Sequence, residues 1–225
     1  MQTDFFRKKS WIAAVGCLLV LFVFFTVVYA AFLGRAQSVW LGQSFYFLLS
    51  NAEHVEAGAY DAQFNGGAGY LLEYGGNEYV VLSVYMKVEE GIAVQNSMAD
   101  KAEILQIDVG RLYFKTCEEK RRATLYQSAL NCLHGCMEVL DEEINRLARG
   151  ATQQSALRIL GILWRQLEYL STAYEESFPK YAQVCKCASE QLNDLLSDIV
   201  YVKDLRYLLC DLTTDYIQIC ADFSL

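Results

Sequence analysis

The sequence has few of the residues and motifs on which catalysis depends. It contains one proline and two histidines in 225 residues, and neither histidine, His54 nor His134, belongs to a triad-like or metal-ligand pattern. There is no His-Glu-x-x-His, no Gly-x-Ser-x-Gly and no glycine-rich phosphate loop followed by Lys-Ser/Thr. The glycine-rich segment 66–69 leads directly into a predicted strand, which indicates a turn. We therefore expect a protein that is not an enzyme and needs no cofactor.

Positive charge is also scarce in most of the chain. The formal net charge is −8, and the first 35 residues hold four basic residues and one acidic residue. The rest of the chain carries 15 basic and 26 acidic residues, a net charge of −11. Binding to a phosphate backbone needs basic patches, so we do not expect a nucleic-acid partner. Apolar residues make up 54% of the chain, which is enough for a packed core.

One segment near the N-terminus has no charge at all. Residues 11–33 are uncharged, and as a helix they would be about 34 Å long, which is enough to cross a bilayer. The basic cluster Arg7-Lys8-Lys9 precedes them and favours a cytoplasmic N-terminus. A cleaved signal peptide is the alternative, but its apolar part is usually only about 7–15 residues long. We expect residues 1–35 to form a basic leader and a single-pass membrane anchor, with the remainder extracytoplasmic.

Residues 43–114 alternate between strand and short-helix patterns. Strands are predicted at 43–50, 69–74, 78–85 and 102–108, with a continuation of the last to Phe114 left open, and short helices at 51–63 and 89–101. Gly75-Gly76-Asn77 lies between two strands and suits a tight hairpin. The predicted order is β-α-β-β-α-β.

After residue 116 the apolar period becomes helical. Thr116 and Glu119 form a capping-box pattern at the start of the first helix. Steps of four and three follow in a first seam (Tyr126, Leu130, Leu133, Met137, Leu140, Ile144, Leu147) and a second (Ala156, Leu160, Leu163, Leu167, Leu170, Tyr174). A third segment covers about residues 180–220. The predicted fold is α+β: a transmembrane helix, a β-α-β-β-α-β domain over 43–114 and an antiparallel three-helix bundle over 116–225.

Three segments of the strand-rich region resemble a known family. FYFLLSN at 45–51, GYLLEYGGNEYVVLSVY at 69–85 and EEGIAVQNSM at 89–98 look like the SPOR domain of bacterial envelope proteins. Tyr79-Val80-Val81 running toward Tyr85 resembles the family's Tyr-x-Val signature, whereas its Gln-x-Gly-Ser-Phe signature is absent. The resemblance implies a ferredoxin-like fold that binds peptidoglycan glycan strands lacking stem peptides through an exposed sheet face. It also implies a role in cell division or sporulation.

Strand alternation separates an apolar face of the predicted sheet from a more polar one. Tyrosines beside hydroxyls and an amide suit a sugar chain, because pyranose rings can lie on aromatic faces. The candidate glycan-binding residues on the more polar face are Tyr46, Ser50, Tyr79, Ser83, Tyr85 and Gln106. Two alternatives stay open: this face could pack beneath the helices, and alignment to the family on Tyr79 makes that tyrosine a core residue and reverses the faces.

The eight cysteines give no clear metal site. Cys132, His134 and Cys136 lie close in sequence, but on a helix position 134 points away from the face that 132 and 136 share. We expect no metal. A disulfide between Cys117 and Cys185 is the one pairing that the predicted helix arrangement suggests, and free buried cysteines are the alternative.

Two functions follow from these patterns. The first is a membrane-anchored envelope protein that binds peptidoglycan glycan. The second is a structural or scaffolding subunit of an envelope machine, which binds a protein partner through its helical bundle.

Overall fold

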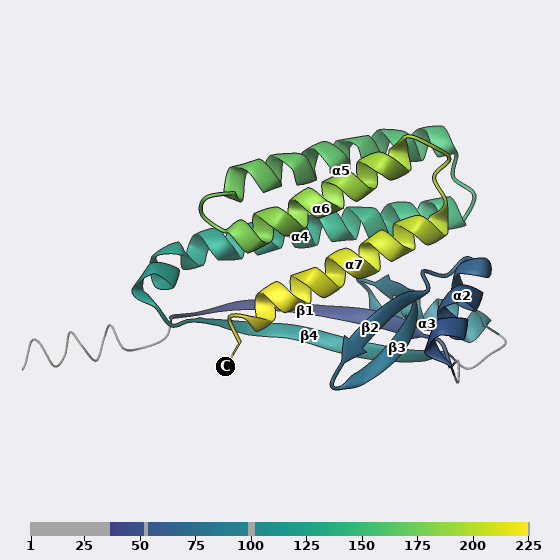
Figure 1. The fold of residues 1–225 in the computed structure, drawn as a ribbon, viewed down its shortest axis with the longest axis horizontal. Helices are drawn as coiled ribbons and strands as arrows, with labels where there is room; N and C mark the ends of the chain where they lie inside the picture. The colour runs from purple at the N-terminus through teal and green to yellow at the C-terminus, as the bar shows by residue number, and fades with distance from the viewer. Residues whose placement is uncertain (1–36, 52–53, 99–101, 225) are drawn as a thin grey trace, which may run out of the picture. The chain divides into compact units, whose positions relative to one another are not determined.

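The computed structural model describes residues 37–51, 54–98 and 102–224, which form a mixed α+β structure (Figure 1). These residues form a four-stranded antiparallel sheet and six helices. The elements are, in order, β1 (Gln37–Leu49), α2 (Val55–Phe64), β2 (Tyr70–Tyr74), β3 (Asn77–Tyr85), α3 (Val88–Ser97), β4 (Glu103–Phe114), α4 (Cys117–Ala148), α5 (Gln153–Tyr174), α6 (Pro179–Leu196) and α7 (Val202–Ala221).

The chain divides into two compact units. Of the described residues, the smaller unit contains 37–38 and 113–123, including the first turns of α4. There the predicted capping box is confirmed, because the Thr116 amide donates to Glu119 Oε2 at 3.0 Å and the Glu119 amide donates to Thr116 Oγ1 at 3.1 Å. The larger unit holds 39–112 and 124–224, with most of the sheet and helices. All contacts discussed below lie within this larger unit.

The strands are arranged in the order β2-β3-β1-β4. The predicted hairpin is confirmed: β2 and β3 are antiparallel, and the two-residue loop Gly75-Gly76 has φ values of 61° and 80°, as a tight hairpin turn requires. Between β1 and β3 the register shifts. The paired residues are Tyr46–Tyr85, Phe47–Val84, Leu48–Ser83 and then Leu49–Val81. Leu82 is thus an extra residue in β3, a β-bulge that changes which side chains share a face.

Two helices, α4 and α7, lie against one face of the sheet, called the inner face below (Figure 1). Phe45, Phe47 and Val84 project from this face and are fully buried. The Phe45 ring centroid lies 5.6 Å from that of Tyr216 on α7 and 5.8 Å from that of His134 on α4. Helices α5 and α6 pack on each other beyond α4 and α7. The apolar face predicted from the residues of β1 therefore forms the main core with the helices.

The first two helical seams are confirmed as core positions. Every residue of the first seam is buried in α4, and in α5 the second seam is buried from Ala156 to Leu170. The Thr152 side chain accepts a hydrogen bond from the Ser155 amide and caps the start of α5. Spacing alone therefore identified which side of each helix packs inward.

The prediction of a three-helix bundle was wrong, because the third segment forms two helices. Helix α6 ends at Leu196 and α7 begins at Val202. At the break, the Ser197 hydroxyl donates to the Asp194 carbonyl, and the Asp198 carboxylate accepts from the Ile199 amide at 2.7 Å. Such local bonds from Ser and Asp compete with helix continuation. Four helices, α4 to α7, thus replace the predicted three.

The predicted fold class also included a membrane-spanning helix, and no such helix is found in the part of the chain that the structure describes. Within the described ranges, no helix has the length and apolar character needed to cross a bilayer. The predicted span at 11–33 falls outside those ranges.

A buried acidic side chain joins α4 to the end of β3. Asp141 on α4 is 4% exposed, and its carboxylate accepts a hydrogen bond from the Met86 amide at 3.0 Å. Asn145, one turn later, donates to Asp141 at 3.3 Å and to Glu90 of α3 at 2.7 Å. Burial raises the pKa of Asp141 to about 6, and the charge of Glu90 acts in the same direction, whereas the Met86 amide and Lys87 oppose the shift.

This raised pKa predicts a pH-dependent effect of Asp141→Asn. The folded state prefers the protonated acid, so the stability that Asp141 contributes is full below its unfolded pKa of 3.8 and is lost as the pH rises through about 6. The amide keeps the acceptor for Met86 without the charge. We expect the variant to gain about 2–3 kcal/mol over wild type between pH 3.5 and pH 7.5, measured by urea unfolding. Glu142→Gln, the exposed neighbour, is the control, and an equal pH profile for Asp141→Asn and wild type would refute the assignment.

Candidate functional site

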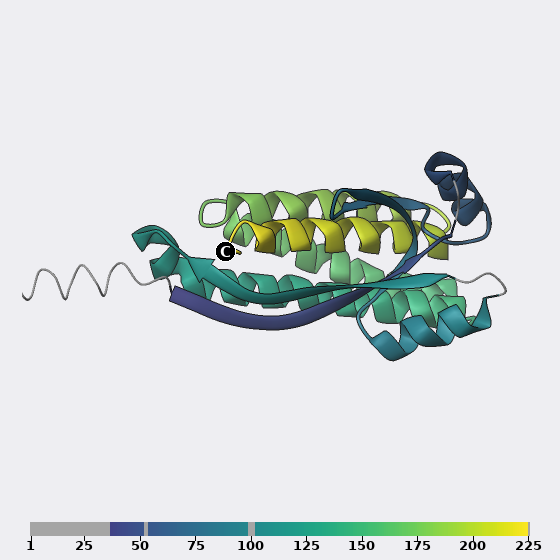
Figure 2. The ribbon, with the colours of Figure 1, turned by 90° about the horizontal axis from the view of Figure 1, so that it is seen from below.

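The second face of the sheet, called the outer face, carries the polar and aromatic residues of interest. Helices α2 and α3 lie at one end of the sheet, and β1 and β4 run side by side away from them (Figure 2). The outer face divides accordingly into two parts. The first is an open strip on β1 and β4, formed by Trp40, Ser44, Tyr46, Gln106 and Asp108. The second is a cavity beside α2 and α3.

Trp40 lies at one end of the open strip. A Cβ atom at Gly110 of β4 would lie 3.1 Å from the Trp40 ring, and one at Gly42 would lie 2.5 Å from Trp40 Nε1. The indole therefore rests on two glycines, which leave room for it because they have no side chain. Trp40 is nevertheless 64% exposed, so much of its side chain is open to solvent. An exposed indole held against the backbone is a rigid stacking platform.

A hydrogen-bonded polar group lies farther along the strip. The Ser44 hydroxyl donates to Asp108 Oδ1 at 2.6 Å, and Gln106 Nε2 donates to the same oxygen at 2.8 Å. These two hydrogen bonds lower the pKa of Asp108, and the bond from Gln106 has the larger effect. Both end on Oδ1, so Oδ2 has no hydrogen bond within the described part of the chain. An ionised, oriented carboxylate with a free oxygen can accept a hydroxyl or amide hydrogen from a ligand.

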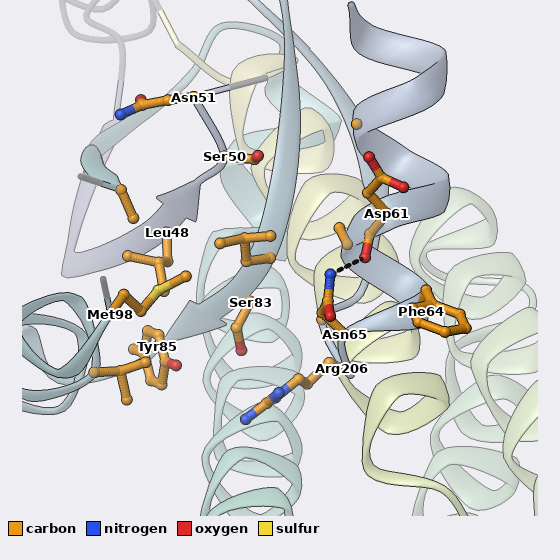
Figure 3. Close-up of a pocket in the computed structure, with 16 residues that line it drawn as sticks. Leu48, Ser50, Asn51, Asp61, Phe64, Asn65, Ser83, Tyr85, Met98 and Arg206 are labelled. Carbon is orange, nitrogen blue, oxygen red and sulfur yellow. Dashed lines mark hydrogen bonds between the residues drawn. The ribbon is translucent and has the colours of Figure 1, made fainter. Parts of the chain in front are cut away.

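The strip continues into the cavity through Tyr46. This half-buried tyrosine packs against a small core of Leu48, Tyr85 and Ala102. The cavity has a volume of about 890 Å³, and Leu48, Tyr85 and Ala102 are among its lining residues (Figure 3). Ser50, Ser83, Asp61 of α2 and Arg206 of α7 contribute polar groups to the lining. A cavity of this size and mixed lining can hold a small molecule.

Five of the six predicted glycan-binding residues are therefore associated with the outer face. Ser50, Ser83 and Tyr85 line the cavity, Tyr46 lies beside it, and Gln106 belongs to the open strip. Ser83 and Tyr85 are only 3% and 2% exposed, so these two are largely covered. Burial raises the pKa of Tyr85, with partial compensation from the Arg206 guanidinium.

Tyr79 lies on the opposite face from Tyr85. It pairs with Leu72 of β2, on the same side of the hairpin as Tyr70. The Tyr70 ring contacts Tyr207 of α7, with ring centroids 5.2 Å apart, so this side faces the helices. The expectation that Tyr79 and Tyr85 share a face was wrong because the bulge at Leu82 reverses the alternation between them.

Several residues of the site, among them Trp40, Ser44 and Arg206, were not among the candidates predicted from the sequence. Trp40 lies in the part of β1 that precedes the predicted start at 43, because the strand begins at Gln37, whereas Ser44 lies inside the predicted strand. Continuing the alternation back from Tyr46 would have placed both on the same face. Arg206 had no comparable signal, because it comes from α7, 140 positions after its hydrogen-bond partner Gly66.

The cysteine-rich segment of α4 does not converge on a common point. Cys132 is exposed, Cys136 is buried with its pKa raised to about 12 by burial, and the His134 ring packs on Phe45. In the residues that the structure covers, no group of three or more metal-binding side chains is close enough to hold an ion. The suggested disulfide is not formed, since Cys117 and Cys185 are both free.

Comparison of the chain with protein-family models, with curated proteins and with solved structures found no match.

Proposed function

We propose that this protein is a non-catalytic glycan-binding protein of the bacterial envelope, and that a glycan chain lies along the open strip of the sheet. Peptidoglycan strands lacking stem peptides are the proposed ligand, and the body of the protein is extracytoplasmic. The resemblance of residues 43–114 to the SPOR domain supports this choice of ligand.

The arrangement of Trp40 is the observation that carries the proposal. Its ring is 64% exposed and lies on Gly42 and Gly110, so a sugar ring can stack on it without any rearrangement of the sheet. Sugar rings have apolar faces and polar edges, and the edge hydroxyls would reach Asp108 and Gln106 next to the stacking surface. The inner face does not compete for this role, because Phe45, Phe47 and Val84 are fully buried there.

Trp40→Ala should weaken glycan binding without unfolding the protein. Loss of a well-placed aromatic anchor costs about 1–3 kcal/mol, which corresponds to roughly tenfold to hundredfold weaker binding. The full chain, kept in a mild detergent because of its apolar N-terminal run, would be titrated onto peptidoglycan sacculi stripped of stem peptides. Tyr169→Ala is the matched control, because Tyr169 is similarly exposed, at 66%, but belongs to helix α5 and not to the sheet. If Trp40→Ala binds as tightly as wild type, the open strip is not the binding surface.

A further inference from the structure

The cavity beside the open strip contains the positive charge of Arg206, which forms no ion pair within the described part of the chain. Arg206 Nη1 donates to the Gly66 carbonyl at 2.7 Å, whereas Arg206 Nε is buried and has no hydrogen-bond partner. No carboxylate among the described residues forms an ion pair with Arg206. Arg206 is only partly buried, but its buried Nε–H lacks a partner, and an unsatisfied buried donor is energetically costly, so this N–H points to a ligand.

Two hydroxyl groups lie beside this guanidinium. Figure 3 shows the side chains of Ser83, Tyr85 and Arg206 directed toward one another at one wall of the cavity. Hydroxyls and a guanidinium together make a donor set for an anion. The Nε–H and one Nη2–H of an arginine lie on one edge of its planar group, and that edge matches the two oxygens of a carboxylate.

The remaining lining limits the charge of the ligand. Among the described residues that line the cavity, Arg206 is the only basic one, and Asp61 of α2 lines the side nearer that helix. A doubly charged phosphate would meet one cation and one repelling carboxylate, whereas a singly charged carboxylate is balanced by Arg206 alone. Asp61, Asn65 and Ser50 can bond to hydroxyl or amide groups, and Leu82, Val94 and Met98 provide apolar contact.

We propose that this cavity binds a sugar residue carrying a carboxylate, with the carboxylate at Arg206 and the hydroxyls toward Asp61 and Asn65. This inference rests on the proposed function: Tyr46 of the open strip packs against Leu48, Tyr85 and Ala102, which line the cavity, so the two parts of the outer face adjoin. Muramic acid residues fit the description. Their lactyl carboxylate is bound in an amide while a stem peptide is attached and becomes a free anion when the peptide is removed. Arg206 thus gives the protein a chemical reason to prefer stripped glycan.

The test varies the ligand and leaves the protein intact. Soluble peptide-free glycan oligosaccharides would be titrated into the full wild-type chain by calorimetry, beside the same oligosaccharides with the lactyl carboxylates converted to methylamides. We expect the free acid to bind at least tenfold more tightly. Equal affinity of the acid and the amide would overturn the carboxylate inference, while the proposed function would stand if Trp40→Ala still weakened both. Binding of neither ligand would overturn both proposals.

A variant series tests the role of Arg206 in the same assay. Arg206→Gln keeps a donor for the Gly66 carbonyl but removes the charge, and it should bind acid and amide equally, at the affinity wild type shows for the amide. Arg206→Lys should retain part of the preference, because it keeps the charge without the planar fork. An undiminished preference for the acid in Arg206→Gln would place the carboxylate elsewhere and contradict the assignment.

Discussion

Replacing Leu140 by Asp should lower the free energy of unfolding by about 4 kcal/mol or more, a large part of the roughly 5–15 kcal/mol that stabilises a typical domain. Leu140 is fully buried in α4, between Met137 and Ile144 of the same seam. The change removes the packing of a leucine and places an unpaired carboxylate in an apolar environment. Circular dichroism during urea and thermal unfolding of the full chain measures the effect.

Val139→Asp provides the control for this substitution. Val139 is the preceding residue of α4 and is 42% exposed, so the same new charge stays in water and should cost only about 0.5 kcal/mol. The difference in stability between the two variants separates the cost of burying the charge from the cost in helix propensity. Similar melting temperatures for Leu140→Asp and Val139→Asp would show that Leu140 does not lie in a core.

Tyr85→Ala should destabilise the protein by about 3–5 kcal/mol, because it removes a large buried aromatic side chain. Tyr85 is 2% exposed and packs with Leu48 and Ala102, and Gly91 of α3 lies so close that a Cβ there would be 3.3 Å from the Tyr85 ring. Loss of the ring therefore removes the surface on which α3 rests. Thermal and urea unfolding report the loss.

Two further variants separate the roles of the tyrosines. Tyr79→Ala, on the opposite face and only half-buried, should cost about 1 kcal/mol and leave the outer face unchanged. Tyr85→Phe keeps the ring and should preserve most of the stability. If Tyr79→Ala lost about 3–5 kcal/mol while Tyr85→Ala kept nearly wild-type stability, the faces assigned by the bulge would be reversed.

Periodicity predicted much of the local structure because it reflects packing directly. The seams of α4 and α5 are buried where the four-and-three spacing places them, and Gly75-Gly76 forms the turn its backbone freedom suits. The break between α6 and α7 was harder to predict, because Asp198 and Ile199 follow a nearly continuous apolar pattern. In the structure, local hydrogen bonds of Ser197 and Asp198 form at the point where the helix ends.

The candidate site could be predicted only in part, and the bulge explains the main error. Alternation assigns faces correctly on β1, but one extra residue in β3 moves Tyr79 to the helix-facing side, and nothing in the alternation marks Leu82 as that residue. The place of Arg206 in the site could not be predicted from the local sequence, for a different reason. Its position in the cavity depends on how α7 packs beside the turn at Gly66, which is a tertiary contact between distant segments.

The most direct test of glycan recognition by the outer face is co-sedimentation of the full wild-type chain with peptidoglycan sacculi from which the stem peptides have been removed. The open platform at Trp40 and the unpaired charge at Arg206 predict that the protein pellets with stripped sacculi and pellets much less with sacculi that retain their peptides. Protein that stays in the supernatant with stripped sacculi, while remaining folded by circular dichroism, would contradict glycan binding by this face.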